Sequence, residues 1–249
     1  MSSDYQLPVF EHMPEGLRRG RSVRDGYARG WGLQFTDLKQ KVLADPLYQE
    51  ACGLAAGKTV QVEENRMNLF LILKFFLAKL AAGHVAEFGS YQGGSAIFMA
   101  KVCQALHPDV QVYAFDTFAG MPATDATIDA HGEGDFKDAK YAELQDFIAS
   151  RGMRNLKLVR GLFEDTAPAA LRGIGKLRLL HIDCDIRSAV AYSYEVSKPY
   201  MVPSGYICFD DALVSSCLGA TEVVEDLLIR RDGLNAEQIY PHFTFRSPG

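Results

Sequence analysis

The sequence predicts an α/β fold in which a mostly parallel, doubly wound sheet of seven strands is covered by helices on both faces. Three observations carry this prediction. Short apolar runs alternate with segments of helical periodicity along most of the chain. Several runs are apolar at consecutive positions, which is typical of strands buried on both faces. The 249 residues, 48% of them hydrophobic, are enough to bury one large core.

Residues 1–60 are interpreted as an N-terminal arm, because proline and glycine interrupt every long periodic pattern there. Helical patches are expected at Thr36–Ala44 and around Tyr48. The arm gathers arginines and aromatic side chains, namely Arg18, Arg19, Arg21, Arg24, Arg29, Tyr27, Trp31 and Phe35. Two interpretations stay open: a solvated arm docked by its aromatic side chains, or a cover over a substrate pocket or a contact within a homo-oligomer.

Residues 61–249 are expected to form the main domain, beginning with a buried helix at Glu63–Ala82. The expected strands are a run through Val85, Ala86 and Phe88, then Val110–Thr117, Leu156–Leu162, Leu177–Asp185, Gly205–Asp210, Gln238–Tyr240 and Phe243–Arg246. The other expected helices are Ala96–Leu106, Tyr141–Arg151, Pro168–Arg172, Ser188–Lys198 and Thr221–Arg231. Residues 118–140 are acidic, contain glycines and lack apolar periodicity, so we expect a lid-like insertion there.

A glycine-rich turn follows the first strand of the main domain and precedes a helix. Its residues are Gly89, Ser90, Tyr91, Gln92, Gly93 and Gly94. Glycine lets the backbone pass close to a ligand, and a helix N-terminus offers unpaired N–H groups and a positive dipole end. The turn therefore indicates a site for a nucleotide or a carboxylate, with plain helix–sheet packing as the alternative.

Two acids extend this site. Asp116 ends the next strand, where an acid commonly accepts hydrogen bonds from a ribose. This arrangement suits an adenosine-containing cofactor, and NAD and S-adenosylmethionine both qualify. Glu87 lies inside the first strand, where a carboxylate is costly unless a cation or a hydrogen-bond donor meets it. The ammonium of an amino acid could be that group.

Four more acids follow two neighbouring strands. Asp183 and Asp185 end one strand, and Asp210 and Asp211 end the next. Carboxylates at adjacent strand ends repel one another, so we expect raised pKa values or a bound cation. Oxygen ligands favour a hard ion, and Mg²⁺ fits, with calcium or manganese as alternatives. The other interpretation is a set of solvent-facing acids that cap helices.

As a set, these motifs resemble those of the class I S-adenosylmethionine-dependent methyltransferases, and more narrowly of the macrocin O-methyltransferase family of antibiotic biosynthesis. The matching segments are 87–89, 93–95, 116–122, 161–166, 181–185, 210–211 and 219–220. The resemblance implies a Rossmann-like fold and a magnesium-dependent transfer of a methyl group to a sugar hydroxyl. Residues 186–188 and the arm depart from the family pattern, which leaves the acceptor open.

The resemblance also implies the residues of the site. Asp183, Asp210 and Asp211 would hold the metal, while Glu87 and Ser95 would contact the methionine part of the donor. The ribose would meet Asp116, and the adenine side would meet Gly161 and Phe163. Further cofactor contacts are expected from Gly89, Ser90, Tyr91, Thr117, Phe118 and Asp183.

Methyl transfer is an in-line displacement that needs aligned reactants and a base for the acceptor proton. Asp185 is the base favoured on physical grounds, because a carboxylate bound to a metal is a weaker base. Asp183 is the residue that the family implies for the metal and serves as an alternative base, and His181 is a third candidate. The acceptor stays open among a nucleotide-linked sugar, a glycosylated natural product and a catechol-like phenol.

Two other functions compete with this one. Tyr194 and Lys198 stand one helical turn apart, as in NAD(P)-dependent short-chain dehydrogenases. However, the glycine turn lies too far along the chain, and the preceding strand ends in His181 and Asp183 instead of the required serine. A non-catalytic nucleotide-binding module is the second alternative, although such a module would not need the metal acids.

Composition excludes several classes of protein. The net charge of −5 and the pI near 5.7 give no bulk attraction to nucleic acid. The apolar segment Met67–Leu80 contains two lysines and is too short for a membrane span. Five cysteines without paired spacing indicate reduced thiols, and the N-terminal residues lack a signal-peptide pattern. We therefore expect a cytoplasmic protein that acts on a small molecule.

Overall fold

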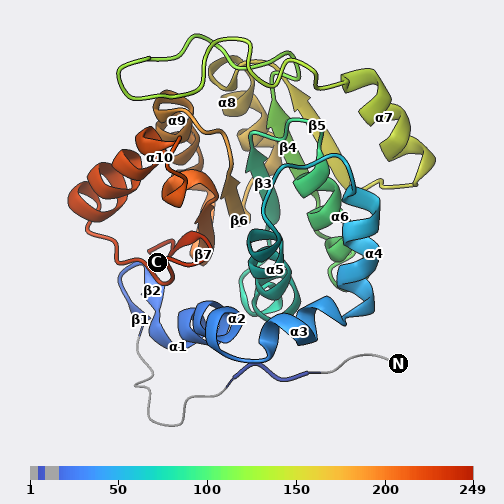
Figure 1. The fold of residues 1–249 in the computed structure, drawn as a ribbon, viewed down its shortest axis with the longest axis vertical. Helices are drawn as coiled ribbons and strands as arrows, with labels where there is room; N and C mark the ends of the chain where they lie inside the picture. The colour runs from blue at the N-terminus through green and yellow to red at the C-terminus, as the bar shows by residue number, and fades with distance from the viewer. Residues whose placement is uncertain (1–4, 9–16, 249) are drawn as a thin grey trace.

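The computed structural model describes residues 5–8 and 17–248, so residues 1–4 and 9–16 of the predicted arm lie outside the described residues (Figure 1). Its centre is a six-stranded sheet with the strand order β5-β4-β3-β6-β7-β8. The strands are β3 His84–Phe88, β4 Val112–Asp116, β5 Leu156–Arg160, β6 Leu177–Ile182, β7 Met201–Phe209 and β8 Phe243–Arg246. All neighbours are parallel except β8, which runs antiparallel to β7. The predicted α/β fold with a mostly parallel sheet is confirmed.

The predicted number of seven strands is wrong by one. The run Gln238–Tyr240 forms only an isolated bridge, between Gln238 and Thr244 of β8. Pro241 directly follows this run and has no N–H group to donate to a strand ladder. The segment therefore turns back on β8 without extending the sheet.

Helices cover both faces of the sheet (Figure 1). One face carries α4 Pro46–Ala55, α5 Glu63–Leu71, α6 Gly94–Leu106 and α7 Tyr141–Ser150, and the other carries α8 Phe163–Ile174, α9 Arg187–Ser197 and α10 Leu218–Val223. The helix α5 continues as a π-helical turn at Ile72–Phe76 and a 3₁₀ turn at Leu77–Lys79, and α10 continues as a π-helix at Val224–Arg231. The helix α8 begins earlier than predicted, with Glu164 and Asp165 suited to its first turn.

Alternation along the strands assigns each side chain to one face. Val85 and Leu179 pack with α4, α5 and α6, whereas Ala86 and Leu180 pack with α8, α9 and α10. Because side chains alternate with a period of two, Glu87 and His181 lie on the α5 face. This placement brings polar groups from α5 and from the end of the chain within reach of both residues.

The described part of the arm is more helical than predicted. After a short hairpin of β1 Leu17–Arg18 and β2 Arg21–Ser22, residues 23–35 are helical throughout, as α1 Val23–Gly26, a π-helix at Tyr27–Trp31 and α2 Gly32–Phe35; α3 Leu38–Leu43 follows. Glycine favours close packing here. A Cβ atom at Gly26 would lie 2.1 Å from the carbonyl oxygen of Glu237, and one at Gly30 would lie 2.8 Å from that of Tyr240.

A buried arginine, Arg29, docks this arm, whereas docking by its aromatic side chains stays a prediction. Arg29 is fully buried and pairs with Glu237 at 2.5 Å. Tyr27, Trp31 and Phe35 are 41%, 44% and 60% exposed. The ion pair joins the helix at residues 23–35 to the segment that leads into β8.

Two further expectations concern the whole chain. All five cysteines are free thiols, as predicted. Within residues 5–8 and 17–248, none of the helices combines the length and the hydrophobicity that crossing a lipid bilayer requires.

Candidate functional site

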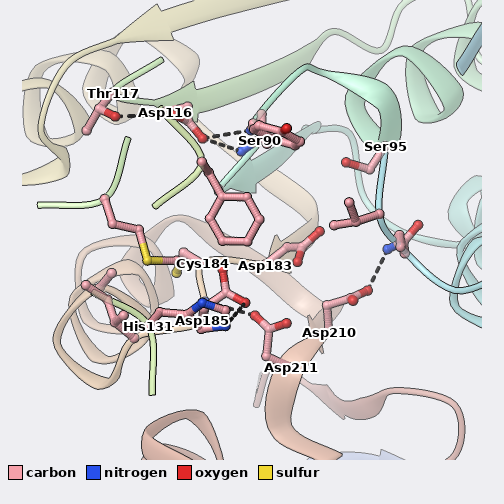
Figure 2. A pocket seen from close by; sticks show the side chains of 18 of the residues that line it. Ser90, Ser95, Asp116, Thr117, His131, Asp183, Cys184, Asp185, Asp210 and Asp211 are labelled. Carbon is pink, nitrogen blue, oxygen red and sulfur yellow. Dashed lines mark hydrogen bonds and ion pairs between the residues drawn. The ribbon is translucent and has the colours of Figure 1, made fainter. Parts of the chain in front are cut away.

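A pocket of about 380 Å³ opens at the carboxyl ends of the central strands (Figure 2). Parallel α/β sheets bind ligands at this edge, beyond the ends of their strands. The predicted site residues that line the pocket are Gly89, Ser90, Tyr91, Ser95, Asp116, Thr117, Phe163, Asp183, Asp185, Asp210 and Asp211. Glu87 and His181 are fully buried and do not line it, nor do Phe118 and Gly161.

Asp116 holds the glycine turn in place. Its Oδ2 atom accepts hydrogen bonds of 2.8 Å from the backbone N–H groups of Ser90 and Tyr91, and its Oδ1 atom accepts one of 2.6 Å from Phe118. Burial raises the pKa of Asp116, while these N–H groups oppose the rise. The turn requires glycine at position 89, where φ is +87° and a Cβ atom would lie 1.7 Å from the carbonyl oxygen of Asp183.

Glu87 meets the hydrogen-bond donors that its burial requires, as the sequence predicted. Ser90 Oγ donates to Glu87 Oε2 at 2.7 Å, and His181 Nδ1 lies 3.0 Å from Glu87 Oε1. Burial alone would lower the pKa of His181, but hydrogen bonds to Asp210 and Glu87 raise it to about 9. At neutral pH the ring of His181 is therefore charged, and it donates to both carboxylates.

The aspartates after β6 and β7 converge. Asp183, Asp210 and Asp211 each present a carboxylate oxygen within 4.8 Å of the others. Burial raises the pKa of Asp183, reinforced by the charges of Asp210 and Asp211, and burial together with the charge of Asp185 raises the pKa of Asp211. The pKa of Asp185 is raised as well, chiefly by burial, so three of the four acids follow the expectation of raised pKa values.

Asp210 is the exception to this rise. Burial would raise its pKa too, but hydrogen bonds from His181 and His242 hold the pKa well below its ordinary value. His242 Nε2 lies 2.8 Å from Asp210 Oδ1, and His181 Nε2 lies 3.3 Å from the same oxygen. The sequence did not point to His242, because it lies far from Asp210 along the chain and in no motif.

Gln61 is a second residue that the motifs missed. It precedes α5, lines the pocket and donates from Nε2 to Asp210 Oδ1 at 2.5 Å. Its Oε1 atom is buried and has no hydrogen-bond partner among the described residues. A buried carbonyl oxygen without a donor is costly, so this atom is suited to accept from a bound ligand.

The insertion at residues 118–140 packs over the pocket. His131 Nε2 lies 3.7 Å from Asp185 Oδ1, and Tyr91 donates from its hydroxyl to Asp138 Oδ1 at 2.8 Å. Asp185 has a left-handed φ of +58°, and its N–H group donates to Asp211 Oδ2 at 3.0 Å. A strained non-glycine backbone of this kind is often found at functional sites.

The tyrosine and lysine that suggested a dehydrogenase lie outside the pocket lining. The Tyr194 hydroxyl donates to Asp232 Oδ2 at 2.7 Å, and Lys198 Nζ donates to the same oxygen at 3.0 Å. Burial and the bond to Asp232 raise the pKa of Tyr194. A tyrosine that acts as a catalytic acid beside a lysine needs the opposite shift.

Known proteins share sequence and fold with this chain. The sequence profile of the macrocin O-methyltransferase (TylF) family matches residues 59–228. The chain is 27% identical over 164 residues to an 8-demethyl-8-(2,3-dimethoxy-alpha-L-rhamnosyl)-tetracenomycin-C 4'-O-methyltransferase from Streptomyces olivaceus. This match covers 61% of the chain and 62% of the relative.

Two solved structures have the same fold. The calicheamicin methyltransferase CalS11 superposes with a TM-score of 0.66 and 17% identity, covering 84% of this chain and 89% of that one. The O-methyltransferase NovP superposes with a TM-score of 0.57 and 21% identity, covering 74% and 80%. The family profile matches more than half of the residues of this chain, and the chain therefore belongs to the macrocin O-methyltransferase family.

Proposed function

We propose that this protein is an S-adenosylmethionine- and Mg²⁺-dependent O-methyltransferase that acts on a sugar hydroxyl of a small molecule in secondary metabolism. One observation carries the proposal: a single pocket holds both the glycine turn fixed by Asp116 and the cluster of Asp183, Asp210 and Asp211. Family membership supports methyl transfer. The rhamnosyl group in the name of the Streptomyces olivaceus relative supports a sugar acceptor.

The donor is assigned to the side of the pocket nearest the glycine turn. Asp116 would accept from the ribose, because its three N–H donors occupy only three of the roughly four lone-pair sites on its carboxylate oxygens. Ser95, in the first turn of α6, would meet the methionine part, with Glu87 behind Ser90 as a buried negative charge. Phe163 lines the pocket and packs edge-on against Phe88 at 5.0 Å, which suits a wall for the adenine.

The metal is assigned to Asp183, Asp210 and Asp211. Three carboxylates form a donor set that suits a hard divalent cation. Burial, reinforced by the charges of neighbouring aspartates, raises the pKa values of Asp183 and Asp211, and a bound cation would favour their charged forms. When bound, Mg²⁺ would lower the pKa of an acceptor hydroxyl. The orphaned Oε1 atom of Gln61 is suited to accept from that hydroxyl or from a water molecule.

Asp185 is the proposed base. It lines the pocket outside the set of three metal ligands, and burial raises its pKa toward the range where a carboxylate can take a proton. Asp183 is the alternative. His181 receives a structural role instead, because it is fully buried between Glu87 and Asp210. Cytoplasmic location and self-association through the arm stay predictions.

The test compares Asp211→Asn with the wild type on a panel of glycosylated and nucleotide-linked sugar acceptors, with and without a chelator. We expect Asp211→Asn to lower kcat by about 100-fold or more and to leave the donor Kd within about threefold. Asp146→Asn, on the exposed surface of α7, is the matched control and should behave as the wild type. Transfer that survives chelation in full, or a parallel loss of donor binding, would contradict the division into two subsites.

A further inference from the structure

A chain of buried hydrogen bonds runs from the N-terminal arm to the pocket. Arg29 Nε donates to Gln238 Oε1 at 3.1 Å, and Gln238 Nε2 donates to Asn68 Oδ1 at 2.9 Å. Asn68 Nδ2 lies 2.9 Å from His242 Nδ1, and His242 Nε2 lies 2.8 Å from Asp210 Oδ1. All five side chains belong to buried residues.

The donor-to-acceptor direction of these hydrogen bonds follows from Arg29. A guanidinium can only donate, so the oxygen of the Gln238 amide must face Arg29 and its nitrogen must donate onward. Asn68 then accepts at its oxygen and donates from its nitrogen to His242. The Nδ1 atom of His242 is therefore an acceptor. The proton of the ring is on Nε2, which faces Asp210.

The bond from His242 acts on one side of the Asp210 carboxylate. Oδ1 also accepts from Gln61 at 2.5 Å and lies 3.3 Å from His181 Nε2. No hydrogen bond from the described residues reaches Oδ2. Donors that gather on one oxygen restrict rotation of the carboxylate of Asp210, which belongs to the cluster with Asp183 and Asp211.

We infer that His242 is a positioning residue, which aims Asp210 at a divalent cation through an Nε2–H tautomer set by Asn68. The inference rests on the proposed function, since it concerns the cation assigned there. His242 does not line the pocket, so it acts through Asp210. It precedes β8, whose antiparallel pairing opposite Phe209 of β7 brings the ring beside Asp210. Arg29, Gln238 and His242 all lie outside the residues matched by the family profile.

Two polar substitutions separate the two contacts of the ring. His242→Gln places an amide nitrogen near the position of Nε2 and keeps a donor to Asp210. His242→Asn reaches only the position of Nδ1 and keeps the contact with Asn68 but loses that with Asp210. We expect His242→Asn to weaken Mn²⁺ binding, followed by electron paramagnetic resonance of the free ion, by about 10- to 100-fold. His242→Gln should stay within about threefold of the wild type.

The outcomes distinguish failure of the positioning role of His242 from failure of the proposed function. Equal Mn²⁺ affinity in the wild type and both variants, or equal weakening in both variants, overturns the positioning role alone. A wild type that binds no Mn²⁺ overturns both the role and the proposed metal dependence. Calorimetry with S-adenosylmethionine checks that each variant retains a folded donor subsite.

A second readout needs no variant. Long-range ¹H–¹⁵N spectra of the wild type should show His242 neutral with its proton on Nε2. A proton on Nδ1 would contradict the direction of the chain and overturn the inference, even if His242→Asn did not fold.

Discussion

Glu87 and His181 are register partners on the parallel strands β3 and β6, and 3.0 Å separates Oε1 of the first from Nδ1 of the second. Both side chains are fully buried. Because the other ring nitrogen faces Asp210 at 3.3 Å, one charged imidazole lies between the buried acid Glu87 and one of the three clustered aspartates.

This pair should be strongly coupled in stability. Removing one partner takes a close counter-charge from the other, which stays fully buried, so Glu87→Gln and His181→Gln should each destabilise the metal-free protein by about 3–5 kcal/mol. The double variant should lose less than the sum, by about 1–3 kcal/mol, in urea unfolding. The same cycle on the exposed pair Lys140 and Glu143 is the control and should give about 0.5 kcal/mol or less. Additive losses at Glu87 and His181 would contradict the coupling.

Gly89→Ala should destabilise the protein and disrupt the glycine turn. The added methyl group would collide with the Asp183 carbonyl oxygen, and the positive φ is strained for alanine. We expect a loss of about 3 kcal/mol or more in the free energy of unfolding, measured by thermal or urea denaturation.

The matched control is Gly173→Ala in α8, where φ is not in the left-handed region and, apart from the adjoining residues and helix backbone, no described atom lies within 4 Å of the new Cβ atom. Alanine there should stabilise the helix by about 0.5–1 kcal/mol. A Gly89→Ala variant as stable as the wild type would mean that the turn is not held as described.

The elements of the main domain were predictable because each carries its own local signal. Apolar runs end at residues such as Phe88 and Ile182, and the polar residues that follow must lie at one edge of a parallel sheet. This rule alone brought Gly89, Asp116, Asp183 and Asp210 together, and the pocket contains all of them.

Contacts between distant segments carried no such signal. Gly26 and Gly30 suggested an irregular arm, although their role is to let a helix approach residues 237–240 closely. Gln61 and His242 lie outside every motif. Each makes its own hydrogen bond to Asp210, and both bonds depend on tertiary packing. Periodicity cannot predict a hydrogen bond between side chains 32 residues apart, as for His242 and Asp210.

Asp232 should make the stability of the protein sensitive to acid. The hydrogen bond from Arg231, with those from Tyr194 and Lys198, lowers the pKa of Asp232 below its ordinary value of 3.8. A carboxylate with a depressed pKa contributes stability above the unfolded-state pKa, and this contribution is lost as the pH falls through the folded-state pKa. Asp232→Asn should therefore be less stable than the wild type by a constant amount from pH 7 to pH 5, with the difference shrinking below about pH 4.

Urea unfolding at a series of pH values measures this difference. Asp226→Asn, at an exposed ion pair with Arg230, is the control and should track the wild type at every pH. A gap between the wild type and Asp232→Asn that stays constant down to pH 2 would contradict the shift.

The insertion at residues 118–140 should close further when both substrates bind. It contacts the glycine turn through Tyr91, whose ring lies 5.2 Å from that of Phe136, and it contacts Asp185 through His131. A donor and an acceptor held between these two contacts would add surface against which the insertion can pack. Trypsin should cut after Lys137 and Lys140 more slowly when S-adenosylhomocysteine, Mg²⁺ and a sugar acceptor are present.

Cleavage at Arg230 and Arg231, remote from the pocket, is the internal control, because general stabilisation would slow it as well. Equal protection at both places, or none at Lys137 and Lys140, would mean that the insertion is a fixed wall of the pocket and not a lid.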